Sequence, residues 1–165
     1  GRSLFDVQLL ARGFDFSLGK DKVVLQQKTI RNYVTHEFVK TSPDTLCSQA
    51  LDHLLAAGQT EGYIVSEADT YLGQITLNEL LQIQRNPDNP HPTVGELAQH
   101  EQITLTDMTS IFEAMKKVED FVGESVPVVS AKDHLKLVGV IPEGNIFKAY
   151  SDAIDEIRQE EYGDS

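Results

Sequence analysis

The chain is poor in the features that mark secreted, fibrous or membrane-spanning proteins. Among its 165 residues there is one cysteine, Cys47, and no tryptophan, so no disulfide can form within the chain. Apolar runs such as residues 137–141 are far shorter than the roughly 20 residues that cross a bilayer. A composition of 40% hydrophobic and 24% charged residues is that of a folded globular protein that buries a core without disulfides or a structural metal.

Positive charge is also scarce. Fourteen Lys and Arg face 26 Asp and Glu, which gives a formal net charge of -12. Nucleic acids require a positively charged surface because their phosphates carry one negative charge per nucleotide. We therefore expect no nucleic-acid partner.

The sequence repeats itself. One set of similar residues recurs after 64 positions: Val39, Thr45, Ala50, Leu51 and Val65 match Ile103, Thr109, Ala114, Met115 and Val129. A second set recurs after 66: Leu72, Gly73, Ile75 and Leu80 match Val138, Gly139, Ile141 and Ile146. A longer hairpin loop near residues 131–136 accounts for the difference of two residues. The chain is therefore a duplicated unit.

Each copy predicts the order β-α-β-β-α, an α+β class. A short apolar strand at residues 38–39 or at Ile103 precedes a helix start, expected at residues 42–44 and 106–107 from their cap-like Ser, Thr, Pro and Asp. Each copy then has two β-rich runs that are typical of a hairpin: 63–65 with 71–75 in the first copy, and 126–129 with 137–141 in the second. A second helix follows from near Leu77 and near Glu143, the latter running on through Ile157, and an extra helical turn is expected at 30–34 and 94–98.

The proline-rich segment 85–92 separates the copies, because its three prolines interrupt helices and strands alike. A unit of about 60 residues buries little apolar area alone. We therefore expect the two copies to pack face to face about a pseudo-two-fold axis. The expected organisation is a linker at 1–28, unit 1 at 29–86, an inter-repeat linker at 87–92, unit 2 at 93–150, and an acidic helix or tail at 151–165.

The repeat resembles a tandem pair of CBS domains, the Bateman module. The resemblance lies in Thr-Leu-x-x-x-Ala-Leu at 45–51, Leu-Gly-x-Ile-Thr at 72–76 and Val-Pro-Val-Val at 126–129, in the family's order and spacing. It covers about residues 29–150. It implies two CBS units packed about a pseudo-two-fold axis and a regulatory role.

The leading segment carries a second resemblance. Residues 3–16, with the core Leu-Leu-x-Arg-Gly-Phe-Asp at 9–15, and then Val-Val-Leu at 23–25 are similar to the linker that follows the last transmembrane helix of bacterial CLC chloride channels and transporters. This implies a cytosolic region at the inner face of the cell membrane. Its expected partners are the transmembrane domain of the same chain and a second copy in a homodimer. Gly1 would then be an expression boundary.

In CBS domains, adenine nucleotides lie between the copies, and the resemblance points to Gly-x-x-Thr/Ser-x-x-Asp after the last strand. A carboxylate there accepts the ribose hydroxyls, and a helix start favours phosphate. Copy 1 has Gly73, Thr76 and Glu79, whereas the second copy has Gly139, Pro142 and Asn145. Neither motif is intact, and Thr76 with Glu79 also reads as a helix capping box. We expect weak or absent binding of ATP and AMP.

The remaining nucleotide-binding candidates follow from the same resemblance and are Val39, Thr41, Tyr63, Ile64, Ile103, Val126 and Pro127. Tyr63 either stacks on a base or packs in the cleft with its hydroxyl hydrogen-bonded. No cofactor is required on this interpretation. ATP, ADP or AMP is an optional regulatory ligand.

Catalytic and metal-binding interpretations have less support. Cys47 with His36 or His53 suggests a thiol nucleophile, but its position beside Leu46 in a predicted helix favours a small core residue. The five histidines lack the close spacing of a zinc site: His36, His53, His91, His100 and His134. Acidic residues near the end either bind divalent cations or form a solvated helix face: Asp152, Asp155, Glu156, Glu160 and Glu161. We expect no enzyme and no metal site.

The leading hypothesis is a regulatory CBS pair of a CLC-type chloride channel or H⁺/Cl⁻ exchanger that modulates gating through dimer contacts. Its dimer surface is expected to include Phe147, Tyr150 and Ile154. One alternative is an adenine-nucleotide sensor that controls an enzyme. Another is a cation-sensing CBS pair of a divalent-metal transporter.

Overall fold

The computed structural model describes residues 19–86, 88, 91–97, 103–119, 121 and 123–163. The channel-like residues 3–16, part of the segment 85–92, His100 and Ala98 lie outside the described residues. No helix among the described residues is long and apolar enough to span a membrane.

The two copies fold alike. Unit 1 consists of β1 (Val39–Thr41), α3 (Cys47–Ala57), β2 (Glu61–Val65), β3 (Tyr71–Thr76) and α4 (Leu77–Gln84). Unit 2 consists of β4 (Leu105–Thr106), α5 (Ile111–Lys117), β5 (Ser125–Val129), β6 (Leu137–Pro142) and α6 (Glu143–Gly163). In each three-stranded sheet the first strand runs parallel to the second, and the second pairs antiparallel with the third. The predicted β-α-β-β-α order and the α+β class are confirmed.

The first helix of each unit begins later than predicted. α3 begins at Cys47 and α5 at Ile111, because the residues expected as caps form tight turns instead. The Thr45 amide donates to the Ser42 carbonyl at 3.1 Å, and the equivalent Thr109 amide donates to the Thr106 carbonyl at 3.0 Å.

The groups that begin these two helices differ between the units. In unit 2 the cap is Ser110, whose hydroxyl accepts from the Glu113 amide at 3.0 Å. The residue 64 positions earlier is Leu46, which has no polar side chain, and there the Gln49 side chain accepts the Leu46 amide at 3.2 Å.

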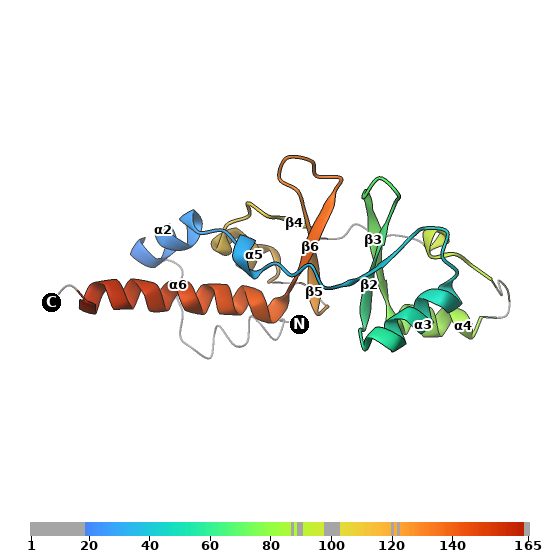
Figure 1. Ribbon diagram of the computed structural model, residues 1–165. Coiled ribbons are helices and arrows are strands. Elements are labelled where there is room, and N and C mark those ends of the chain that lie inside the picture. Colours follow the sequence, from blue (N-terminus) through green and yellow to red (C-terminus); the bar gives the residue numbers. More distant parts are fainter. Residues whose placement is uncertain are drawn as a thin grey trace.

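The two sheets face each other, with their helices on the outer sides (Figure 1). Residues that are equivalent in the repeat meet across this interface. At the hairpin loops the Tyr71 amide donates to the Leu135 carbonyl at 2.7 Å, and the Leu137 amide donates to the Asp69 carbonyl at 3.3 Å. Because Tyr71 and Leu137 are 66 positions apart, as are Asp69 and Leu135, these contacts place a pseudo-two-fold axis between the sheets.

The leading segments of the two units are exchanged. The segment before unit 1 contains α2 (Gly19–Gln27) and a 3-10 turn, η1 (Arg31–Tyr33), and it packs on unit 2. Its Thr29 bridges to Ser110 of unit 2. The segment before unit 2 contains η2 (Val94–Glu96), and its Thr93 bridges in the same way to Leu46 of unit 1. Each unit is therefore completed by a segment that precedes the other unit in the sequence, and this exchange connects the two units.

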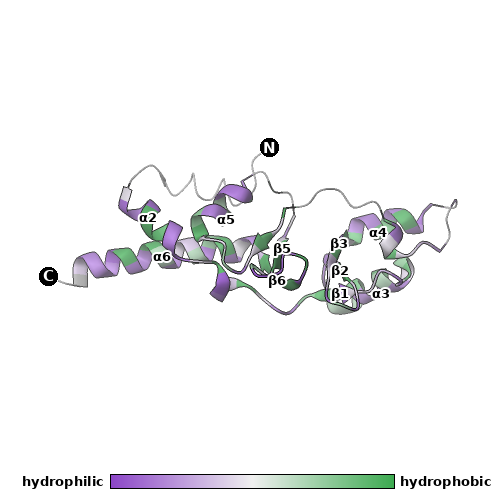
Figure 2. Ribbon diagram, turned by 90° about the horizontal axis from the view of Figure 1, so that it is seen from above, coloured by the Kyte–Doolittle hydropathy of each residue, from purple (hydrophilic) through white to green (hydrophobic). Residues whose placement is uncertain are grey.

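Each unit has its own core, and the exchanged residues belong to it. Ile30 from the first leading segment is buried with Leu105, Ile111 and other residues of unit 2. Val94 from the second is buried with Leu54, Ile75 and other residues of unit 1. In Figure 2 the apolar segments gather on the strands and on the helix turns that face them, and the far end of α6 is hydrophilic.

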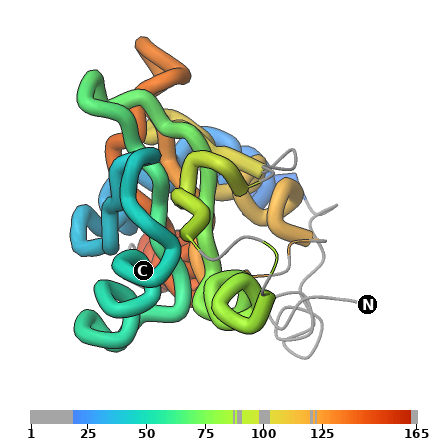
Figure 3. The backbone as a smooth tube through the Cα atoms, turned by 90° about the vertical axis from the view of Figure 1, so that its right-hand side faces the viewer, coloured from blue at the N-terminus to red at the C-terminus, as the bar shows by residue number. Residues whose placement is uncertain are grey.

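The predicted dimer surface on α6 is wrong. Tyr150 and Ile154 are 2% and 3% exposed, and Phe147 packs against the same core. Both α5 and α2 lie against α6, and α2 is attached to it where Lys20 pairs with Glu161 at 3.2 Å and Lys28 pairs with Glu156. Figure 3 looks along the molecule, with unit 1 in front of unit 2. α6 continues without a break from unit 2 into the acidic segment 151–163.

Candidate functional site

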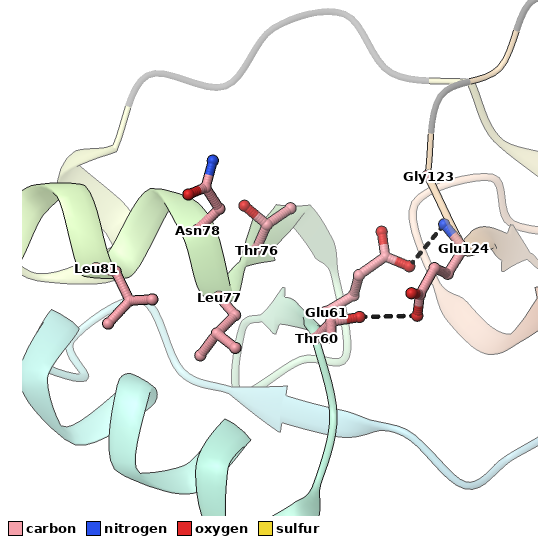
Figure 4. Close-up of a pocket in the computed structure, with 8 residues that line it drawn as sticks. All are labelled: Thr60, Glu61, Thr76, Leu77, Asn78, Leu81, Gly123 and Glu124. Carbon is pink, nitrogen blue, oxygen red and sulfur yellow. Dashed lines mark hydrogen bonds between the residues drawn. The ribbon is translucent and has the colours of Figure 1, made fainter.

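A cavity of about 320 Å³ lies where the two units meet, at the end of the interface opposite the hairpin loops (Figure 4). Unit 1 contributes the start of β2, the end of β3 and the first turns of α4, and unit 2 contributes the residues just before β5. The lining residues are Thr60, Glu61, Thr76, Leu77, Asn78, Leu81, Gly123 and Glu124. Among the described residues of this lining, only Glu61 and Glu124 carry charge, on their carboxylates.

Thr76 lies in this cavity as the N-cap of α4. Its hydroxyl accepts the Glu79 amide at 3.1 Å, so one half of the predicted capping box is formed. Glu79 is exposed on the first turn of α4 and does not line the cavity. The candidate motif therefore contributes Thr76 to the cavity but not the carboxylate of Glu79.

Glu61 occupies the boundary between the units. Its Oε1 accepts the amides of Glu124 at 3.2 Å and of Ser125 at 2.9 Å, and its Oε2 accepts the side chain of Gln74. In the reverse direction the Thr60 hydroxyl donates to Glu124 Oε2 at 2.8 Å. Burial raises the pKa of Glu61, and the nearby Glu124 adds to this, although the hydrogen bonds from Ser125, Glu124 and Gln74 act against it.

Tyr63 packs within the interface. It is 2% exposed, and its ring meets Phe38 edge-on with centroids 5.6 Å apart. Its hydroxyl lies 3.5 Å from the Gln74 side chain, which faces it across β2 and β3. Burial raises the pKa of the Tyr63 hydroxyl above its usual range. The geometry matches the packing alternative, since neighbouring side chains cover the ring.

Thr41 carries an unpaired buried hydroxyl. The residue is 5% exposed, and its Oγ1 has no hydrogen-bond partner among the described residues. It ends β1 opposite Ile64 of β2. Ile64 belongs to the core of unit 1, and Val39 packs against that core. A buried hydroxyl without a partner carries a desolvation cost, which a ligand or water that bonds to it would offset.

The equivalent motif of unit 2 serves the leading segment instead. The Asn145 side chain donates to the Tyr33 carbonyl at 3.0 Å. Gly139 is required by close approach, because a Cβ there would lie 2.5 Å from Val34 and 2.7 Å from the Thr35 carbonyl oxygen. Pro142 pairs with Ser125 at the end of β6.

The other unit 2 candidates also lie away from the cavity lining. Val126 is buried in the core, and Ile103 packs against it. Pro127 lies on β5 opposite Val140. Of the predicted site residues, the structure therefore brings only Thr76 into this cavity.

Sequence reasoning missed Glu61 and Glu124, which dominate the electrostatics of the cavity. The repeat aligns Thr60 with Glu124 and Glu61 with Ser125. The available signal was at the strand start, where the repeat aligns an acidic residue in one copy with a small polar residue in the other.

Cys47 lies in a second, smaller cavity of about 220 Å³ within unit 1, together with Leu51, Leu80 and Pro92. Its side chain is buried, and burial with a contribution from Glu96 raises the pKa of the thiol, which disfavours the nucleophilic thiolate. Within the described part of the chain no group of three or more His, Cys, Asp or Glu residues could hold a metal ion. His36 approaches the Val138 carbonyl at 2.7 Å and is exposed, as are His53, His91 and His134.

Comparison with known proteins identifies this architecture. Residues 94–152 match the CBS domain family model. The structure of CbpB in complex with c-di-AMP has a TM-score of 0.69 and 14% identity, covering 88% of this chain and 99% of that one. The cystathionine beta-synthase pair domain of a protein assigned as a Mg²⁺ transporter from Shewanella oneidensis MR-1 has a TM-score of 0.62 and 18% identity, covering 94% and 99%.

CBSX2, a CBS-pair protein from Arabidopsis thaliana, in complex with AMP has a TM-score of 0.58 and 23% identity, covering 76% of this chain and 97% of that one. Comparison with curated protein sequences gave no significant match. Residues 94–152 match the CBS domain model, and the chain as a whole has the fold of a CBS domain pair.

Proposed function

We propose that this CBS pair is a non-catalytic regulatory module at the cytoplasmic face of the inner membrane, part of a CLC-type chloride channel or H⁺/Cl⁻ exchanger. It modulates gating by passing a change of shape to the transmembrane domain of the same chain, and it works as a homodimer. The CLC-like sequence at residues 3–16 supports the transporter context.

The observation that carries this proposal is the docking of the leading segment on unit 2. The Ile30 amide donates to the Thr109 carbonyl at 3.0 Å, and the Ile111 amide donates to the Lys28 carbonyl at 2.8 Å. Further along, Thr35 exchanges two backbone hydrogen bonds with Val140 of β6, at 2.8 and 3.0 Å. The segment that leads back to the CLC-like residues is thus attached to unit 2, the later of the two units in the sequence.

This attachment supports coupling in both directions. A displacement of the leading segment must shift α5 and β6, or break the hydrogen bonds that hold it. Conversely, a rearrangement between the units changes the position from which the leading segment emerges. The module shifts a gating equilibrium by the difference in its free energy between the two states and by no more.

The test uses the full-length protein in proteoliposomes and measures chloride efflux. Leu25→Ala removes a side chain that is 1% exposed and docks α2 on unit 2, whereas Val23→Ala changes a side chain on the same helix that is 50% exposed. We expect altered gating for Leu25→Ala and unchanged gating for Val23→Ala. Equal efflux in both variants, or a parent reading frame without long apolar spans upstream of Gly1, would contradict the proposal.

A second candidate function is the binding of an adenine nucleotide between the units. The unpaired hydroxyl of Thr41 and the cavity beside Thr76 favour it, and the similar CbpB and CBSX2 structures contain c-di-AMP and AMP. The two carboxylates of the cavity oppose a triphosphate, so we expect weak binding with AMP preferred over ATP. Titration calorimetry of both nucleotides tests this, and micromolar ATP affinity that is lost on Thr76→Ala would refute it.

A further inference from the structure

The two ends of the interface between the units are held by different kinds of bond. At the hairpin end the contacts are backbone hydrogen bonds, from Tyr71 to Leu135 and from Leu137 to Asp69. At the cavity end the contacts run through carboxylates: Glu61 accepts two amides of unit 2, and Glu124 accepts the hydroxyl of Thr60. Backbone hydrogen bonds do not titrate at ordinary pH, whereas carboxylates do.

The groups that face Glu61 leave its charge poorly compensated. Its own strand contributes Tyr63, β3 contributes Tyr71 and the neutral Gln74, and the segment before β5 contributes Glu124. The part of α4 that lines the cavity, Leu77, Asn78 and Leu81, is uncharged. When both carboxylates are ionised, two like charges therefore face the same cavity from opposite units, and the lining residues that the structure describes include no Lys or Arg.

We propose that Glu61 is a proton-controlled latch that sets how far the two units separate at the cavity end of their interface, with the paired hairpin loops as the hinge. Closing buries the Glu61 carboxyl group against unit 2, and opening returns it to water. Since burial disfavours the ionised form, the closed state takes up a proton more readily than the open state. Falling pH therefore favours closure, and rising pH favours opening.

A proton on Glu61 also changes its relation to Glu124. The neutral carboxyl group keeps a carbonyl oxygen that accepts the amides of Glu124 and Ser125, and its hydroxyl is a donor where the ionised group has none. The repulsion between the two carboxylates disappears at the same time. The latch acts whether or not a nucleotide occupies the cavity, so it goes beyond the proposed function and does not depend on it.

The test is amide hydrogen exchange, resolved to single residues by NMR over about pH 5 to 8 and corrected for the intrinsic rate at each pH. The reporters are the amides of Glu124 and Ser125, which donate to Glu61, and the internal references are the amides of Tyr71 and Leu137 at the hinge. In the wild-type chain we expect protection at the two reporters to fall as pH rises, while protection at the references stays constant.

Three variants separate the latch from a merely structural contact. Glu61→Gln keeps an acceptor oxygen without a charge, so we expect protection that no longer varies with pH. Glu61→Ala removes the acceptor, so we expect exchange at the reporters to quicken about tenfold or more. Glu79→Gln neutralises an exposed carboxylate outside the cavity and is expected to match the wild type.

Four results would overturn the proposal: reporter protection in the wild type that does not change with pH, the same pH dependence in Glu61→Gln, unchanged reporter exchange in Glu61→Ala, or reference amides that lose protection together with the reporters. If Glu61→Ala fails to fold, the comparison of wild type with Glu61→Gln alone decides between the latch and its absence.

Discussion

Substitution of Ile30 tests the exchange of leading segments. Ile30 is 0% exposed and lies only nine residues before β1 of unit 1, yet its side chain belongs to the core of unit 2. Replacing a buried isoleucine with alanine costs about 2–5 kcal/mol, from lost transfer free energy and from the cavity that remains. For a chain of this size, each kcal/mol lowers the melting temperature by about 2–4 °C. We therefore expect Ile30→Ala to lower the melting temperature by about 4–20 °C.

The location of the damage is more informative than its size. Hydrogen exchange should quicken first in α5 and β5, which share a core with Ile30, and only later in α3 and β2. Val94 occupies the equivalent position in the other exchanged segment and is also 0% exposed. Val94→Ala is the matched control, and we expect it to loosen α3 and β2 first.

One result would refute this reasoning. If Ile30→Ala quickened exchange in unit 1 and left unit 2 unchanged, each leading segment would pack on the unit that follows it in sequence. The two leading segments would then not be exchanged, and the proposed route from the leading segment to α5 and β6 would not exist.

Three further substitutions have expected outcomes. Thr41→Val removes the unpaired buried hydroxyl, whose burial costs about 1–3 kcal/mol, so we expect a higher melting temperature; a lower one would mean that the hydroxyl is paired in solution. Thr76→Ala removes the α4 cap and should lower the free energy of unfolding by about 1 kcal/mol in urea titrations, with Thr76→Ser as the control that retains it. Glu61→Gln should stabilise the chain at pH 7–8: burial raises the pKa of Glu61, so the ionised form costs folding free energy above that pKa. This cost, and the gain in Glu61→Gln, should vanish as pH falls to the ordinary glutamate value of about 4.3, and a gain in melting temperature that does not change with pH would contradict this reasoning.

The fold was predictable because it depends on patterns that recur. The match of Ile75 with Ile141 and of Leu80 with Ile146 comes from positions that face the core in both units, and the helices after the last strands begin at Leu77 and Glu143 as predicted. The first helix of each unit was placed too early because Ser, Thr and Asp stabilise turns as readily as helix caps. Local sequence does not decide between a turn and a helix cap when the candidate residues for both lie within four positions of each other.

The contacts that the sequence did not predict are those between distant segments. The covering of α6 by α2 was missed because α2 buries only Leu25 fully and lacks a clear apolar face. Glu61 was missed for a related reason: its two partners in unit 2 lie more than 60 residues away, and its repeat equivalent is Ser125. A charged residue on a strand gives no local sign of the unit to which its carboxylate will bond.

The two copies of the repeat differ at positions that give the two units different contacts. At the equivalent positions 76 and 142, unit 1 keeps a threonine whereas unit 2 has a proline, and at 61 and 125 unit 1 has the bridging carboxylate whereas unit 2 offers its backbone amide. Unit 2 uses Asn145 and Gly139 to hold the leading segment. The cavity thus belongs mainly to unit 1, and the attachment of the leading segment belongs to unit 2. On the proposed function, a signal that begins in the cavity and reaches the leading segment crosses the interface between the units, and the Glu61 carboxylate bonds across that interface beside the cavity.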